Sequence, residues 1–169
     1  MAKVGTMDQA VKAMVNREGK YLTFTLAEEE YGIGILKVKE IIGIMPITTV
    51  PQTPDYMKGV INLRGKVIPV VDLRLKFGME AVAYTERTCI IVVEITGNNQ
   101  KIQLGSLVDS VSEVLSIKAG DIEDTPNFGS HLNTDYILGM AKTGGRVKIL
   151  LDIDKVLSDK ELSAVSVAA

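Results

Sequence analysis

One cysteine and one histidine are the side chains in this sequence that most readily act as a nucleophile or a base. Cys89 begins the apolar run Cys89-Ile-Ile-Val-Val93, where a cysteine is expected to pack as a small hydrophobic residue. His131 follows Ser130, but adjacent residues do not make a catalytic pair, because triads are assembled in space. A single cysteine and a single histidine also rule out an internal disulfide and a zinc site that needs several such ligands. We therefore predict no catalytic residues, no metal, no cofactor and no enzyme activity.

The charge balance argues against a nucleic-acid partner. The chain has 19 Lys and Arg against 21 Asp and Glu, a formal net charge of -2. Binding a polyanion needs clustered positive charge, and binding single strands also uses exposed aromatic rings, which are few here. The pairs Gly32-Ile-Gly34 and Gly144-Gly145 do not continue into a phosphate-loop motif and are expected to be hairpin glycines. A nucleic-acid-binding barrel of the SH3-like or OB-like type is kept as the alternative function.

Length and composition predict one compact body in the cytoplasm. The 169 residues are 46% hydrophobic and 24% charged, which is enough apolar surface for a folded core. No apolar run approaches the roughly 18 residues of a membrane span, and residues 1–20 lack the apolar stretch of a secretory signal, so no membrane insertion is expected. With three Phe, five Tyr and no Trp, the core must consist of Val, Ile and Leu, which favour strands.

A segment of the first half of the sequence recurs in the second half. Residues 38–44 match residues 111–117 at a shift of 73 positions, and residues 22–26 and 89–95 occupy comparable places. Chance similarity between two β-rich halves is the alternative, but residues 55–72 align on residues 135–152 without a gap and with the same apolar alternation. That alignment contains six identical pairs: Asp55/Asp135, Tyr56/Tyr136, Gly59/Gly139, Gly65/Gly145, Val67/Val147 and Asp72/Asp152.

The repeat predicts an all-β protein made of two small barrels. Each copy is expected to form about five short strands and one short helix after the last strand. We predict a first barrel over residues 20–84 and a second over 85–158, with strand exchange between them possible, because such small barrels are marginal alone. Pro69 lies inside a strand and predicts an edge strand or a bulge.

The two ends of the chain are expected to lie outside the barrels. Residues 1–19 are predicted to be a flexible or weakly helical segment, and residues 159–169 a tail. Apolar side chains recur at helical spacing in the first of these segments, at Met7, Ala10, Val11, Met14 and Val15.

Differences between the two copies point to candidate binding residues. The first copy forms a turn from Asn62-Leu63-Arg64, whereas the second uses Lys142-Thr143-Gly144, so Arg64 is not needed to close the hairpin. Its guanidinium can bind a carboxylate or the carbonyls of a partner, although a solvated turn arginine is an equally good explanation of Arg64 alone. If Glu40 approaches Arg64, the pair would hold the guanidinium in a fixed orientation.

Two apolar segments carry further candidates. Val38, Ile41 and Ile42 are expected to be core residues, although the lysines between them could leave one valine exposed. Val111 and Val114 alternate with polar residues, so one face of that strand must be solvated or covered by a partner.

Three segments of the sequence, residues 30–41, 58–74 and 108–115, carry a resemblance to a known family. Their most specific part is the run Asn62-Leu-Arg-Gly-Lys-Val-Ile-Pro-Val-Val-Asp-Leu-Arg74. On these segments the sequence resembles the CheW family of bacterial chemotaxis coupling proteins, and the resemblance runs from about Lys20 to Leu157. The resemblance implies two SH3-like five-stranded barrels and a non-enzymatic adaptor. It implies as partners the cytoplasmic tip of chemoreceptors and the regulatory domain of the histidine kinase CheA, within signalling arrays.

The resemblance also implies which residues contact the partners. Val38, Glu40, Gly59 and Arg64 match first-barrel positions implicated in receptor or kinase coupling, and Val111 and Val114 match second-barrel positions near the receptor groove. With the turn residues Asn62 and Leu63, these form the predicted partner-binding set.

Overall fold

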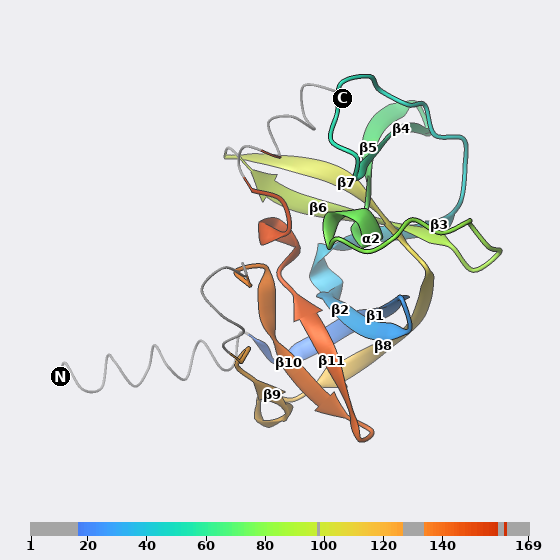
Figure 1. Cartoon of the computed structure of the whole chain (residues 1–169). Helices are drawn as coiled ribbons and strands as arrows, with labels where there is room; N and C mark the ends of the chain where they lie inside the picture. The colour runs from blue at the N-terminus through green and yellow to red at the C-terminus, as the bar shows by residue number, and fades with distance from the viewer. Residues whose placement is uncertain (1–16, 98, 127–133, 159–160, 162–169) are drawn as a thin grey trace.

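The computed structural model describes residues 17–97, 99–126, 134–158 and 161 (Figure 1). Within these residues the chain is mostly β-structure, and α2 (Leu73–Lys76) is the α-helix that lies wholly among them. The 3-10 helices are η1 (Ile35–Lys37), η2 (Ala119–Asp121) and η3 (Ile153–Lys155). The strands are β1 (Gly19–Leu26), β2 (Glu29–Gly34), β3 (Val38–Gly43), β4 (Met57–Leu63), β5 (Lys66–Asp72), β6 (Cys89–Gly97), β7 (Gln100–Val108), β8 (Ser110–Ile117), β9 (Ile122–Glu123), β10 (Ile137–Thr143) and β11 (Arg146–Leu151).

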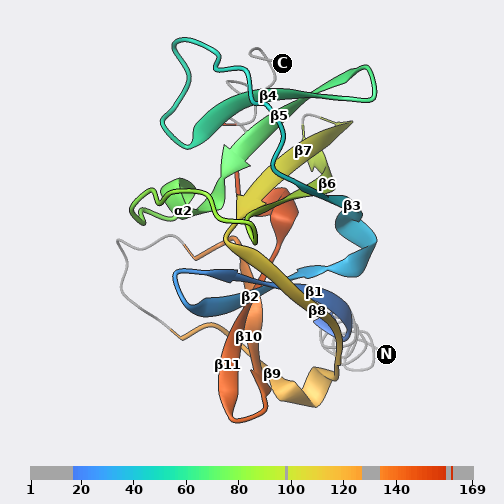
Figure 2. The ribbon, with the colours of Figure 1, turned by 90° about the vertical axis from the view of Figure 1, so that its right-hand side faces the viewer.

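The strands form two mixed sheets, which lie one above the other in Figure 2. The first sheet has the order β3-β6-β7-β5-β4, and the second has the order β8-β1-β2-β11-β10-β9. The two-residue strand β9 has a counterpart in the first sheet, the isolated bridge between Thr48 and Val60. The predicted all-β fold of two SH3-like barrels with short helices is therefore confirmed.

The register of the strands follows the sequence repeat. In the first sheet Ile41 pairs with Ile91 and Val70 with Gly105, while in the second Val114 pairs with Leu22 and Leu150 with Gly32. The same backbone bond closes both copies, from Asp72 N to Tyr56 O and from Asp152 N to Tyr136 O, each at 2.8 Å. Equivalent residues of the two copies are separated by a constant number of positions within each pair of equivalent strands. The separation is 80 positions between the β4–β5 hairpin and the β10–β11 hairpin, 73 between β3 and β8 and between β2 and β7, and 69 between β1 and β6.

Each sheet takes one hairpin from the other copy. The β1–β2 hairpin pairs with β8 and β11, and the β6–β7 hairpin pairs with β3 and β5. Both sheets therefore contain strands from either side of residue 84, and they are not contiguous halves of the chain. Because each sheet needs the hairpin of the other, neither is complete alone.

The largest core cluster joins the two sheets. It buries Phe24 and Leu26 of β1 together with Ile91 and Val93 of β6. A stack of four aromatic rings runs through it, from Phe24 to Tyr31, Phe77 and Tyr136, with centroids 5.1 to 6.1 Å apart. Burial of such large apolar groups between the sheets is the main source of their association.

The sequence predicts an edge strand or a bulge at Pro69, and the edge-strand alternative is wrong. The β4–β5 pairing does contain a register shift, but its extra residue lies on β4, between Met57 and Gly59. Strand β5 lies between β4 and β7, so it is an internal strand of its sheet. Pairing with β7 starts only at Val70, one residue after the proline. Pro69, which has no N–H to donate, therefore lies just before the first residue pair between β5 and β7.

Candidate functional site

Arg64 lies in a tight turn that favours glycine. Its φ is 52° and that of Gly65 is 87°, and the second copy places Gly144 and Gly145 at the same two positions, with φ of 59° and 76°. The left-handed conformation costs a non-glycine residue about 1 kcal/mol or more. The first copy therefore keeps an arginine at a position where the second uses the better suited residue.

The Arg64 side chain is held in place although it is 72% exposed. Its Nη2 donates to Oε1 of Glu40 on β3, and this hydrogen bond raises the pKa of Arg64. The Asn62 Oδ1 accepts from the N–H of Gly65 at 2.8 Å and closes the turn. From the sequence, a contact between Glu40 and Arg64 is only a condition; the structure contains it, and it fixes the direction of an exposed cation.

The second barrel has a different ion pair at the same turn. Lys142, the counterpart of Asn62, places its Nζ 2.6 Å from Oε1 of Glu123, and both side chains are more than half exposed. Glu113, the counterpart of Glu40, lies in a bulge whose backbone is bonded to the Thr23 hydroxyl. At this turn, the first barrel therefore has an exposed guanidinium held by a carboxylate, whereas the second barrel has a lysine ion pair.

The edge strands of the two sheets, β3 and β8, carry equivalent bulges. Between Val38 and Ile41 there is one residue more than on β6, and between Val111 and Val114 there is one more than on β1. The extra residue in each bulge interrupts the alternation of side chains between the two faces of the sheet, so the residues after it no longer keep the alternation set by those before it. Val38 and Val111 are half-buried against the common core, whereas Ile41 is 43% and Val114 is 49% exposed.

Ile41 was wrongly predicted to be a core residue. The exposed apolar side chain of β3 is this isoleucine rather than a valine. The sequence repeat could have indicated this exposure, because Ile41 is the counterpart of Val114, which lies in the segment where one face of the strand was expected to be solvated or covered by a partner. An edge strand with an exposed aliphatic side chain and unpaired backbone groups is suited to contact another protein.

The remaining predicted residues contribute less surface. Leu63 is half-buried and packs against the core cluster of the first barrel. Gly59 is buried and has a φ of 142°, and a Cβ there would lie 2.0 Å from the carbonyl oxygen of Thr48. Its close approach to that backbone is a packing requirement, and Gly59 offers no side chain to a partner.

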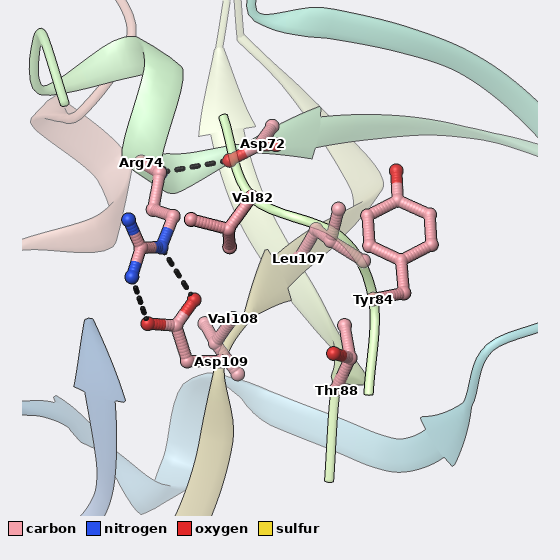
Figure 3. Close-up of a pocket in the computed structure, with 8 residues that line it drawn as sticks. All are labelled: Asp72, Arg74, Val82, Tyr84, Thr88, Leu107, Val108 and Asp109. Atoms are coloured by element: carbon pink, nitrogen blue, oxygen red, sulfur yellow. Dashed lines mark hydrogen bonds and ion pairs between the residues drawn. The ribbon is translucent and has the colours of Figure 1, made fainter. Parts of the chain in front are cut away.

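A second ion pair, which the sequence analysis missed, joins the two sheets (Figure 3). Arg74 of α2 binds Asp109 in a bidentate manner, with Nε–Oδ1 and Nη2–Oδ2 distances of 2.7 Å. The Oδ2 of Asp109 also accepts from the N–H of Ala27 at 2.9 Å, in a turn where Ala27 and Glu28 both have positive φ. We call Arg74, Asp109 and Ala27 the inter-sheet clamp.

The clamp determines the charge state of Asp109. Burial alone would raise the pKa of this carboxyl group, but the hydrogen bonds from Arg74 and Ala27 outweigh it and lower the pKa. Asp109 is the residue between β7 and β8, where the chain passes from the first sheet to the second. The side chain is therefore ionised at neutral pH and ties this crossing point to α2 and to the β1–β2 turn.

Glu161 links the C-terminal part of the described chain to the first barrel. Its Oε1 accepts a hydrogen bond from the N–H of Ser158 at 2.9 Å, and its Oε2 lies 2.9 Å from Nζ of Lys76. Burial tends to raise the pKa of Glu161, but bonds from Ser158, Lys76 and Tyr56 lower it to about 2.

The low pKa of Glu161 predicts a contribution to acid stability. The folded pKa lies below the ordinary value of 4.5, so the contribution is present above that pH and is lost as the pH falls toward about 2. We expect the melting temperature of Glu161→Gln to decline less steeply than that of the wild type over this range, as measured by circular dichroism. Parallel curves for the two proteins would contradict this role.

The described residues do not contain a recognisable reaction centre. Among residues 17–97, 99–126, 134–158 and 161, no three His, Cys, Asp or Glu side chains are grouped as metal ligands. Cys89 is partly buried against the core and donates its thiol to the carbonyl of Arg87 at 3.1 Å. His131 lies outside the described residues. The described helices include none with the length and apolar character needed to span a membrane.

The fold and this surface define a double SH3-like β-barrel protein whose distinctive exposed features are an oriented arginine and two apolar strand edges. The family model for the CheW-like domain matches residues 20–161. The chain belongs to this CheW family.

Known relatives cover nearly the whole chain. The chemotaxis protein CheW of Klebsiella aerogenes is 44% identical over 98% of this chain and 96% of its own length. The protein of the same name from Rhizobium meliloti is 35% identical over 94% and 99%. Among solved structures, the crystal structure of the scaffolding protein TtCheW from Thermoanaerobacter tengcongensis has a TM-score of 0.74 and 37% identity, covering 85% of this chain and 95% of that one.

Proposed function

We propose that this protein is a cytoplasmic, non-enzymatic adaptor of bacterial chemotaxis, which couples the cytoplasmic tips of chemoreceptors to the regulatory domain of the histidine kinase CheA. The names of its relatives, chemotaxis and scaffolding proteins, support the class of function. The identity of the two partners comes from the family resemblance. The partner-binding residues of this proposal are Val38, Glu40, Gly59, Asn62, Leu63, Arg64, Val111 and Val114, of which the buried Gly59 would act through the backbone path that it permits rather than through a side chain.

The observation that carries the proposal is the exposed, oriented Arg64. A surface arginine without a role would be replaceable by the glycine that its backbone conformation favours, as at Gly144. Instead the chain keeps the guanidinium and fixes it with Glu40. Because an ordered arginine loses less entropy on binding than a free one, it is a good anchor for carboxylates or carbonyls of a partner.

The substitution Arg64→Gly tests this proposal. It removes the guanidinium and installs the residue that the second barrel uses at this turn, so the free energy of unfolding should change by less than about 1 kcal/mol. Binding to a receptor-tip fragment or to the kinase regulatory domain should weaken about tenfold, which is about 1.4 kcal/mol. Sedimentation of the mixed components measures both interactions.

The matched control is Lys142→Ala, which removes the exposed cation of the second barrel and should leave binding unchanged. Failure of the wild-type protein to bind either partner would contradict the adaptor function. Equal binding by wild type and Arg64→Gly would contradict the role of the arginine. A salt-dependent shift with RNA would favour the alternative, a nucleic-acid-binding barrel.

A further inference from the structure

Two cavities in the structure are counterparts under the internal repeat. The first is the pocket of Figure 3, lined by eight residues around the inter-sheet clamp. The second, which we call the open groove, lies beside η1 and η3. Six residues of the first cavity have counterparts that line the open groove: Asp72/Asp152, Arg74/Asp154, Leu107/Gly34, Val108/Ile35, Asp109/Leu36 and Thr88/Gly19.

The two cavities differ in how much of their space is filled. The clamp cavity has a volume of only about 10 Å³, whereas the open groove has about 630 Å³. The clamp cavity is covered by Val82 and Tyr84, which belong to the segment that leads into β6. The segment that precedes β1 in the sequence is its counterpart, and at the offset of 69 positions Ala13 and Val15 align with Val82 and Tyr84. Those two residues lie outside the described part of the chain.

The open groove presents an unpartnered apolar side chain. Leu36 is 92% exposed, the highest value among the exposed large hydrophobic residues of the described chain. Its counterpart is Asp109, which binds Arg74 in the clamp. At the open groove other residues make the contact that Arg74 and Asp109 make in the clamp. Asp154 pairs with Lys37 at 2.6 Å and accepts a hydrogen bond from the N–H of Thr96 at 2.9 Å. Leu36 is therefore not needed to join the sheets at this point.

We propose that residues 1–16 of this chain occupy the open groove and cover Leu36, as residues 79–88 cover the clamp cavity. The described chain begins at Arg17, and the next residues, Glu18, Gly19 and Lys20, already line the groove. The segment therefore enters at the groove itself. It supplies apolar side chains at Met7, Ala10, Val11, Met14 and Val15 to pack on Leu36 and Leu138.

The C-terminal segment is a poorer occupant. It would be the counterpart of the chain after α2, but Glu161 is bound to Lys76 and to the N–H of Ser158. These contacts direct the described end of the chain toward a different cavity, which Lys76, Tyr136 and Glu161 line. Arg64, Ile41 and Val114 are not among the residues that line the open groove, although its residue Lys37 directly precedes Val38 of the proposed partner-binding set. The experiment below locates residues 1–16 without any partner, so its outcome does not depend on the proposed function.

Paramagnetic relaxation in the full-length chain tests the proposal. A nitroxide is attached to Gln9→Cys in a Cys89→Ala background, and the amide signals of the ¹⁵N-labelled protein are recorded with the nitroxide oxidised and reduced. We expect loss of signal at Gly34, Lys37, Leu138 and Asp152, which surround the groove. Leu36→Ser should restore these signals, and Val15→Ser should do so from the side of the segment. Val147→Ser, at another aliphatic side chain that is 53% exposed, should leave the loss unchanged.

Four results would overturn the proposal. Unchanged signals around the groove would mean that residues 1–16 do not occupy it, and loss centred on Ile41 or Val114 would place the segment elsewhere. Loss of signal in a mixture of ¹⁵N-labelled unmodified chain and unlabelled spin-labelled chain would mean that a second copy supplies the segment. Loss that persists in both Leu36→Ser and Val15→Ser would contradict the apolar contact.

Discussion

Asp109→Asn is expected to lower the free energy of unfolding by about 2–3 kcal/mol, a large effect for an isosteric change. The substitution removes the charge that Arg74 binds through two bonds of 2.7 Å, while the guanidinium stays mostly buried, with 16% of the side chain exposed. It also weakens the acceptor for the N–H of Ala27 in a turn with positive φ. Chemical denaturation followed by circular dichroism measures the change.

Two further variants show whether the loss of stability comes from the inter-sheet clamp itself or from the removal of any one charge. Glu123→Gln removes the partner of Lys142 at an exposed pair, where we expect a change below about 0.5 kcal/mol. Replacing both Arg74 and Asp109 by leucine should restore part of the stability lost in Asp109→Asn, since the buried unpaired charge is then gone. If Asp109→Asn were no less stable than Glu123→Gln, the clamp would contribute no more than a surface ion pair.

The sequence repeat predicted much of this fold because it combines two kinds of local signal. Gly65 and Gly145 mark the turns, and the apolar alternation on either side defines the paired strands, as the register of β4–β5 and β10–β11 confirms. These contacts join residues close in sequence. The parallel pairings of β5 with β7 and of β11 with β2 join distant residues, and no local pattern indicates which hairpin each sheet receives.

The same distinction explains what was found and missed at the site. The repeat singled out Arg64 because its counterpart is glycine, whereas the contact with Glu40 was raised only as a condition, because the sequence does not show which strands approach each other. Asp109 carried no such signal, since its role depends on the approach of α2 and of the β1–β2 turn. Exposure of Ile41 depends on a single extra residue in β3, which the apolar pattern alone does not reveal.

Gly59→Ala is expected to lower the free energy of unfolding by more than about 4 kcal/mol, a large part of the roughly 5–15 kcal/mol by which domains are ordinarily stable. The added Cβ would lie 2.0 Å from the carbonyl oxygen and 2.7 Å from the carbonyl carbon of Thr48. That backbone cannot move without loss of the bridge to Val60, whose two hydrogen bonds are 2.8 and 2.9 Å long. Thermal and chemical unfolding of the purified variant measure the loss.

A series of glycine substitutions distinguishes this steric clash from the cost of backbone conformation. Gly65→Ala, where φ is 87° and a Cβ meets nothing within 4 Å, should cost about 1 kcal/mol. Gly43→Ala, which has open space and an ordinary φ, should change stability by less than about 0.5 kcal/mol. If Gly59→Ala matched Gly65→Ala, the backbone conformation alone would account for the glycine. If Gly59→Ala instead lost the more than about 4 kcal/mol expected above, the steric clash would be the cause. A binding defect of a variant at position 59 could then be assigned to partner contact only after binding is measured on folded protein.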